Sequence, residues 1–73
     1  MNKDLDKAIK LYNQSREILE IILIDKFIKH TQYYWIKKGI GSATVQKLKN
    51  NIEEMQITTL INLIKRMEEL ENE

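Results

Sequence analysis

The stretch KKGIGSATVQKLKNN, residues 37–51, holds the only two glycines of a 73-residue chain that contains no proline. Gly39 suits the end of a helix, because a residue without a Cβ atom readily adopts the left-handed conformation that closes many helices. Ile40 is the apolar residue of the turn, and we expect it to enter the core. Gly41 or Ser42 then suits the cap of a second helix. The segment predicts a tight turn between two helices.

Apolar residues outside this turn recur every three or four positions, which is the period of a helix. No segment alternates apolar and polar residues as a half-buried strand does. The polar triplets 13–15 and 30–32 are the expected breaks in a run that would otherwise be unusually long, and the Thr58 hydroxyl is expected to cap the last helix. We therefore predict one all-α domain, residues 1–73, folded as a compact bundle of about five short helices with a helix-turn-helix-like unit around residues 31–50. The predicted helices cover residues 3–13, 16–29, 31–38, 42–50 and 58–71.

The composition argues against an enzyme, a metal site and a membrane span. The chain has no cysteine and one histidine, so it lacks disulfides, thiolate ligands and a multi-histidine metal site. It contains no phosphate-binding P-loop, nucleophile elbow or zinc spacing, and we expect no catalysis, no cofactor and no small-molecule substrate. The most apolar run, residues 18–24, is far shorter than the ~20 residues that cross a bilayer, and the N-terminus lacks the pattern of a secretory signal. We expect a soluble, cytoplasmic protein.

The formal net charge of +1 conceals a gradient along the chain. Residues 1–24 carry four basic and four acidic side chains. Residues 25–49 carry six lysines and one aspartate, whereas residues 50–73 carry two basic residues and six glutamates. The three thirds therefore have charges of 0, +5 and −4. A basic middle between a neutral and an acidic third predicts a local site for an anion.

Residues 39–67, GIGSATVQKLKNNIEEMQITTLINLIKRM, resemble the second half of the Cro- and phage-repressor-like helix-turn-helix family. The likeness lies in the glycine-hydrophobic turn, a small-polar helix with Thr44, Val45 and Leu48, and a last amphipathic helix after a short loop. It implies a small transcriptional regulator of phage or mobile-element type that reads DNA with helix 42–50. Because such domains read paired half-sites, it also implies a homodimer.

Side chains around the turn suit that ligand. On a helix over residues 42–50, Val45 and Leu48 face inward, and an outer face of small and polar residues remains. Glutamine can bond an adenine edge through two hydrogen bonds, small residues allow close approach to the major groove, and lysines contact phosphates. The predicted DNA-binding residues are Lys37, Lys38, Ser42, Ala43, Thr44, Gln46, Lys47, Lys49 and Asn50, with Gly39, Ile40 and Gly41 forming the turn.

The turn also resembles a second nucleic-acid motif, the helix-hairpin-helix, through its glycine-hydrophobic-glycine sequence GIGSATVQKL. That resemblance implies that the backbone amides of residues 39–41 bind a phosphate without reading sequence, as helix N-termini do. The neighbouring aromatic residues Tyr33, Tyr34 and Trp35 could stack on exposed bases, but at helical spacing we expect them to be core anchors.

The alternative to nucleic-acid binding is a helical protein-interaction module, such as an inhibitor, antitoxin or immunity-type protein. The near-neutral net charge favours it, and so does the apolar helix 18–28, whose residues nearly encircle the helix. Leu19, Leu23 and Phe27 share one side of that helix and a row of isoleucines occupies the other. A 73-residue monomer can hardly cover both sides, so we expect a homodimer through residues 18–28.

Overall fold

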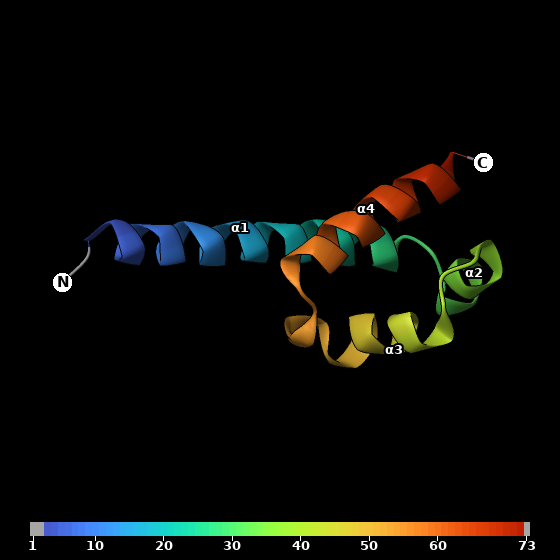
Figure 1. The fold of residues 1–73 in the computed structure, drawn as a ribbon. Coiled ribbons are helices and arrows are strands. Elements are labelled where there is room, and N and C mark those ends of the chain that lie inside the picture. Colours follow the sequence, from blue (N-terminus) through green and yellow to red (C-terminus); the bar gives the residue numbers. More distant parts are fainter. Residues whose placement is uncertain (1–2, 73) are drawn as a thin grey trace.

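The computed structural model describes residues 3–72, which form four α-helices and one turn of 3₁₀ helix (Figure 1). No strand occurs among these residues, so the predicted all-α class is confirmed. The elements, in chain order, are α1 (Lys3–Ile28), α2 (Gln32–Lys38), α3 (Ser42–Asn50), η1 (Ile52–Glu54) and α4 (Ile57–Glu71). α1 and α4 pack against each other, α3 runs along the opposite side of the molecule, and α2 lies at the end that connects them (Figure 1).

α1 is one continuous helix of 26 residues, so the two helices predicted at residues 3–13 and 16–29 were wrong. The triplet Asn13–Gln14–Ser15 does not break it. None of these residues is proline or glycine, and each disfavours a helix by no more than about 0.7 kcal/mol relative to alanine. The backbone hydrogen-bond ladder therefore continues through them, and the described residues hold four α-helices where about five were predicted.

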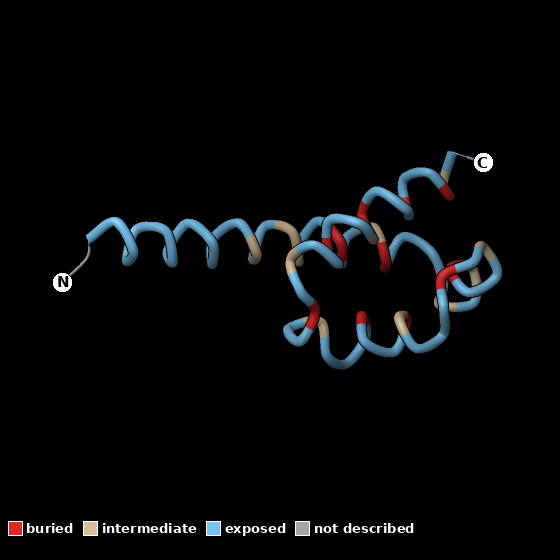
Figure 2. Tube along the Cα trace, in the orientation of Figure 1, coloured by how far each residue is buried: buried red, intermediate tan, exposed pale blue. Residues whose placement is uncertain are grey.

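The hydrophobic core lies between the second half of α1 and the remaining elements (Figure 2). α1 contributes Leu23 and Phe27, and α2 contributes Trp35. The other buried members are Ile40, Val45, Leu48, Met55, Leu60, Ile64, Met67 and Leu70. Every residue from 3 to 15 is exposed, so the first half of α1 extends beyond the packed part of the structure. The molecule as a whole is elongated, with a longest dimension of 50 Å. The compact part of the fold is therefore residues 16–72.

The boundaries predicted around the turn are confirmed. α2 ends at Lys38 and α3 covers residues 42–50, as the sequence indicates. The break expected at residues 30–32 is also present, because α1 ends at Ile28 and Thr31 caps the start of α2.

The start of α4 differs from the prediction. Thr58 does not cap this helix, which begins one residue earlier, at Ile57. The preceding Gln56 is extended and makes no side-chain capping hydrogen bond. Met55 just before it is also extended and its side chain is buried in the core. Burial of Met55, not a side-chain cap, therefore fixes the point where the chain enters α4.

The turn between α2 and α3 has the geometry that its two glycines predicted. Gly39 has φ 114° and ψ 5°, which lies in the left-handed region, and Gly41 is extended at φ −61° and precedes α3. The Gly39 amide donates to the Ile36 carbonyl at 3.1 Å, and the Ile40 amide donates to the Trp35 carbonyl at 2.9 Å. This pair of bonds is the Schellman closure of a helix. It directs the Ile40 side chain into the core, where it is buried as predicted.

Arg16 fastens the loop after α3 to the middle of α1. Its Nη2 atom donates to the carbonyl oxygens of Ile52 at 3.1 Å and Glu53 at 2.9 Å, and its Nε atom lies 3.0 Å from a carboxylate oxygen of Glu20. The Arg16 side chain is 17% exposed, which is low for an arginine. Arg16 is the first residue of α1 that is partly buried. Its guanidinium gives the Glu53 carbonyl a partner and adds a second hydrogen bond to the Ile52 carbonyl, which also accepts from the Met55 amide at 3.1 Å.

We predict that the two glycines differ in their effect on stability. Gly39→Ala should lower the free energy of unfolding by about 1–2 kcal/mol, because φ 114° is strained for any residue with a Cβ atom. The strain is in the backbone, since the new Cβ would lie 3.7 Å from the nearest atom, Nη2 of Arg66. Gly41→Ala is the matched control and should cost less than about 1 kcal/mol, because the φ of Gly41 is ordinary, its Cβ would lie 3.9 Å from Thr44, and only the preference for glycine over alanine at the N-cap of α3 is lost. Thermal unfolding measures both, and equal melting temperatures for the two variants would contradict the assignment.

We also predict that Arg16→Met lowers the free energy of unfolding by about 1–3 kcal/mol, because a charged donor to two carbonyls is lost. Lys10→Met removes a similar charge from the exposed half of α1 and should change stability by less than about 0.5 kcal/mol. Urea unfolding followed by circular dichroism compares the two variants. If Lys10→Met lowers the free energy of unfolding as much as Arg16→Met does, the hydrogen bonds of Arg16 to the carbonyls of residues 52 and 53 do not stabilise the fold.

Candidate nucleic-acid interface

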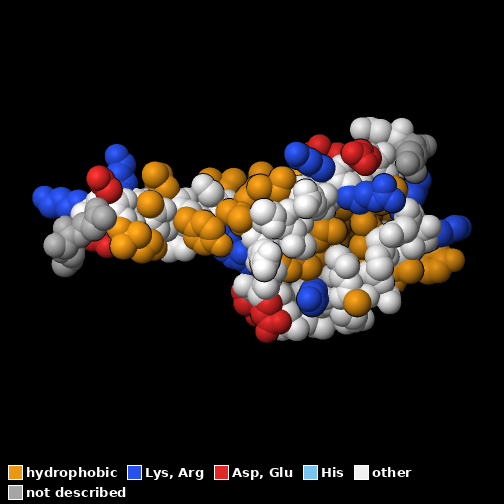
Figure 3. Space-filling model, in the orientation of Figure 1, with side chains coloured by type: hydrophobic (Ala, Val, Ile, Leu, Met, Phe, Trp, Pro, Cys, Tyr) orange, Lys and Arg blue, Asp and Glu red, His pale blue; other side chains and the backbone are white. Residues whose placement is uncertain are grey.

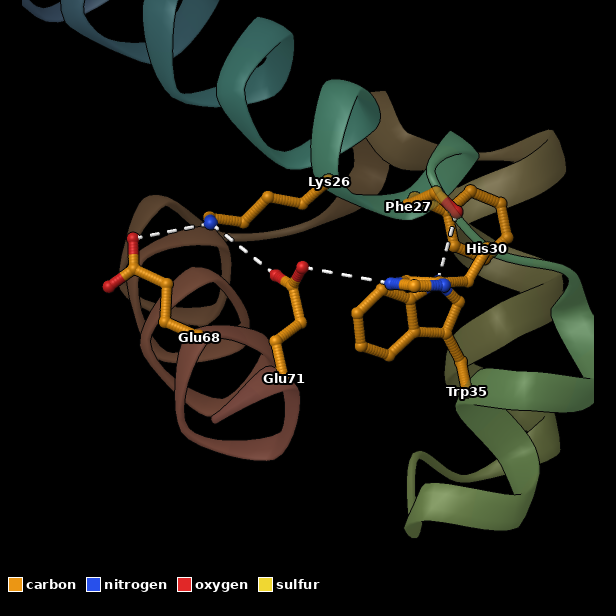
Figure 4. Close-up of polar contacts among 6 residues, drawn as sticks. All are labelled: Lys26, Phe27, His30, Trp35, Glu68 and Glu71. Atoms are coloured by element: carbon orange, nitrogen blue, oxygen red, sulfur yellow. Dashed lines mark hydrogen bonds and ion pairs between the residues drawn. The ribbon is translucent and has the colours of Figure 1, made fainter. Parts of the chain in front are cut away.

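Trp35 holds α2, the helix before the turn, in place (Figure 4). The indole is fully buried and its Nε1 atom donates to the Phe27 carbonyl at 2.9 Å. That carbonyl belongs to the last turn of α1, where carbonyls lack partners within the helix. At the start of α2, the Thr31 hydroxyl accepts a hydrogen bond from the Tyr34 amide at 3.1 Å. The Thr31 cap fixes the start of α2, and the hydrogen bonds of the Gly39 and Ile40 amides fix its end. The position where α3 begins follows from these two points.

The three neighbouring aromatic residues divide between core and surface. Trp35 is the core anchor that the sequence predicted, but the same prediction for Tyr33 was wrong, because its side chain is 71% exposed. Tyr34 is half-buried and stacks on the His30 ring at a centroid distance of 3.8 Å. Tyr33 is therefore the one ring of this group with a largely free face.

α3 exposes the face that the sequence assigned to DNA. Val45 and Leu48 are buried in the core, and Thr44 is half-buried beside them. The exposed residues are Ser42, Ala43, Gln46, Lys47, Lys49 and Asn50. Gln46 and Asn50 lie one helical turn apart, and the Asn50 Nδ2 atom donates to Oε1 of Gln46 at 3.3 Å. The face therefore presents a linked amide pair and small residues, with a lysine at each margin.

The remaining predicted residues lie before and within the turn. Lys37 is exposed and its ammonium lies 6.0 Å from the centroid of the Tyr33 ring. Lys38 is half-buried, with its ammonium 5.7 Å from the Tyr34 ring. Ile40 is buried, so it serves the turn without being accessible to a ligand.

The segment of chain that carries this surface contains basic side chains but no acidic ones. No acidic residue occurs between Asp25 and Glu53, an interval that includes all of α2 and α3. The exposed Glu53 and Glu54 of η1 follow directly after α3 and mark the acidic limit of the surface at that end. The lysines of α2 and α3 are therefore not interrupted by any acidic residue along this interval.

Arg66 of α4 lies beside the turn, a position that sequence reasoning missed. Its Nη2 atom is 3.7 Å from where a Cβ atom would stand on Gly39, and its side chain is about half exposed. A carboxylate oxygen of Glu69 lies 4.0 Å from Nη1. The helical pattern of α4 places Arg66 outside the core, between buried Ile64 and Met67, but no pattern along the chain relates it to Gly39.

Two acidic residues at the end of α4 are engaged away from α3 (Figure 4). The Lys26 ammonium lies 3.5 Å from Glu68 and 3.6 Å from Glu71. Glu71 also lies 3.7 Å from Nε2 of His30. These pairs connect α4 to the end of α1, so part of the acidic third of the chain is neutralised locally.

Residues 3–72 enclose no pocket and contain no group of side chains that could hold a metal ion. Within the same residues, no helix combines the length and the apolar character needed to cross a bilayer. Comparison with protein-family models, curated proteins and solved structures finds no match for this chain.

Proposed function

We propose that the protein is a small DNA-binding transcriptional regulator of phage or mobile-element type, in which α2, the turn and α3 form a helix-turn-helix unit. The observation that carries the proposal is the outer face of α3. It has small and amide side chains at its centre and lysines at both margins, in an interval of the chain that lacks acidic residues. Small residues allow a helix to approach the major groove closely, and lysines neutralise the flanking phosphates.

The amide pair on α3 supports base reading. Oε1 of Gln46 accepts a hydrogen bond from Nδ2 of Asn50 at 3.3 Å, so the two amides lie side by side on the outer face of α3. Gln46 then presents its amide donors, and Asn50 presents its carbonyl oxygen. The adenine edge in the major groove offers an acceptor at N7 and a donor at N6, which complements this pair.

Phosphate contacts come from the lysines and from Arg66. Lys47 and Lys49 flank the outer face of α3, and Lys37 lies at the end of α2. Arg66 adds a guanidinium beside Gly39, where a DNA backbone passing the turn would lie within its reach. These contacts fix the position of the protein on the duplex without reading sequence.

The helix-hairpin-helix mode receives less support. It requires the amides of residues 39–41 to face a phosphate, but the amides of Gly39 and Ile40 donate to the carbonyls of Ile36 and Trp35. Two of the three groups are therefore used to end α2. Side chains of α3 are better placed than backbone amides to make the contact.

A helical protein-interaction module is the second candidate, and one observation favours it. Nine large apolar side chains of α1 are exposed, and the other elements within residues 3–72 together expose fewer such side chains. Such a surface is typical of a protein interface. Within the DNA-binding proposal, the same surface supports the homodimer through residues 18–28, since Ile21 and Ile28 are both exposed there.

We predict that Gln46→Ala and Lys47→Ala weaken DNA binding in different ways. Loss of the Gln46 amide should cost roughly 1–3 kcal/mol on the preferred site and little on random DNA. Loss of the Lys47 ammonium should weaken binding to both alike and reduce the salt slope by about one unit. The measurement is fluorescence anisotropy at several salt concentrations, on a site selected from pooled genomic DNA.

Both residues are exposed, so neither variant should change the melting temperature by more than a degree or two. If Gln46→Ala loses affinity equally on every sequence, α3 does not read bases. If the unmutated protein binds no DNA at low salt, the proposal fails and the interaction module is favoured.

A further inference from the structure

A row of exposed residues follows α1 on the side away from the core. Successive members are three or four positions apart, which is the heptad spacing of a coiled coil. The outer row consists of Leu11, Gln14, Ile18, Ile21, Asp25 and Ile28, and all six are exposed. Figure 3 shows apolar side chains gathered along α1, including the half that extends beyond the body.

The outer row is distinct from the side of α1 that packs in the core. At 3.6 residues per turn, Ile21 lies roughly 160° around the helix from Leu23, and Ile18 roughly 140°. Leu23 is fully buried, whereas Ile18 is 58% exposed and Ile28 is 70% exposed. A partner on the outer row would therefore contact α1 without disturbing the core.

The outer row complements itself when two copies run in opposite directions. With Ile18 opposite the second copy's Ile21, Leu11 faces Ile28 and Gln14 faces Asp25. Each apolar residue then meets an apolar residue, and each polar residue meets a polar one. In a parallel pair, Asp25 would face its own copy, and two carboxylates at close range repel. Neither Gln14 nor Asp25 has a side-chain partner within residues 3–72.

We infer that a second copy of this chain docks antiparallel along the outer row of α1, with Gln14 of each copy opposite Asp25 of the other. The pairing buries the exposed isoleucines of residues 18–28 and also uses Leu11 from the extended half of the helix. The two-fold axis passes between positions 19 and 20. The matched order of polar and apolar positions specifies a second copy, because an unrelated partner would not require it.

This arrangement determines how the dimer presents α3, a consequence that rests on the proposed function. α3 lies on the side of the body away from α1 (Figures 1 and 2). Two bodies on opposite sides of the paired α1 helices hold their α3 faces pointing apart. The dimer would then bridge two DNA segments instead of reading two half-sites on one face of one duplex.

Substitutions of opposite charge at Gln14 distinguish an antiparallel dimer from a parallel one, because the two arrangements predict different directions of change in the dimer dissociation constant. Gln14→Lys places a lysine opposite Asp25 in an antiparallel dimer and should lower the dimer dissociation constant roughly three- to tenfold, through two equivalent ion pairs. Gln14→Glu places a carboxylate opposite Asp25 and should raise it by a similar factor. In a parallel dimer both variants would face themselves and both would weaken. Sedimentation equilibrium of the full chain at low salt measures the constants.

A second pair of variants tests whether the outer row, and not the core-facing side of α1, forms the dimer interface. Ile18→Asp, on the outer row, should raise the dimer dissociation constant roughly a hundredfold or more. Ile9→Asp is the matched control, because Ile9 is 50% exposed but lies on the core-facing side of α1 in the extended half. It should leave the constant unchanged, and circular dichroism checks that both variants stay helical. A monomer at tens of micromolar, or equal effects at positions 9 and 18, would overturn the inference.

The DNA consequence is measured separately, by capture of a fluorescent duplex on beads that carry a second duplex. The unmutated protein should retain the fluorescent duplex, and Ile18→Asp should bind single duplexes without linking them. Sedimentation contains no DNA, so a dimer that binds no duplex would disprove the proposed function alone. Linking by the Ile18→Asp protein would disprove the bridging role of the outer row.

Discussion

The fold depends on the burial of one side chain, Trp35. Its indole donates to the Phe27 carbonyl, one of the groups that the end of α1 leaves without an intrahelical partner. Its own carbonyl accepts the Ile40 amide, which closes α2 and turns the chain toward α3. A single buried residue thus connects α1, α2 and the turn. An apolar residue of similar size would fill the space but leave the Phe27 carbonyl unpaired, at a cost of about 1–3 kcal/mol.

The position of α3 follows from that connection. With α2 fixed by Trp35 and the turn fixed by Gly39, Val45 and Leu48 enter the core and the opposite face of α3 points outward. Hydrophobic burial thereby determines which polar side chains a ligand can reach. Among the acidic residues of α4, Glu68 and Glu71 pair with Lys26 at the end of α1, whereas Glu69 lies 4.0 Å from Arg66 beside the turn. The Lys26 side chain is only 17% exposed, and its two pairs hold negative charge of α4 at the end of α1.

α1 has two sides with different roles. Its core side holds Leu23 and Phe27 and ends, toward the N-terminus, at the Arg16 anchor. Its outer row is apolar without being covered by the chain itself. Helix 3–15 makes no buried contact, and a helix of this length is marginal when isolated in water. Continuity with the packed half supports it, and the inferred second copy would add to that support.

The sequence by itself determined the helical class, the turn at residues 39–41, the limits of α3 and the residues on its outer face. These features are local: they depend on helical periodicity and on the one position where only glycine is unstrained. Sequence also indicated a break at residues 13–15, and this was wrong because weak propensities do not stop a helix whose hydrogen bonds continue.

Only the tertiary structure decided the features that depend on packing between distant segments. It joined Arg16 to the loop at residues 52–53, placed Arg66 beside Gly39, and put Trp35 in the core while Tyr33 stayed outside. It also started α4 at Ile57, after buried Met55, and not at a capping threonine. Each outcome pairs residues far apart along the chain or is set by burial, and helical periodicity carries no information about which face meets which. The physical reason is that a helix specifies its own apolar side, whereas its partner is chosen by the burial of the whole core.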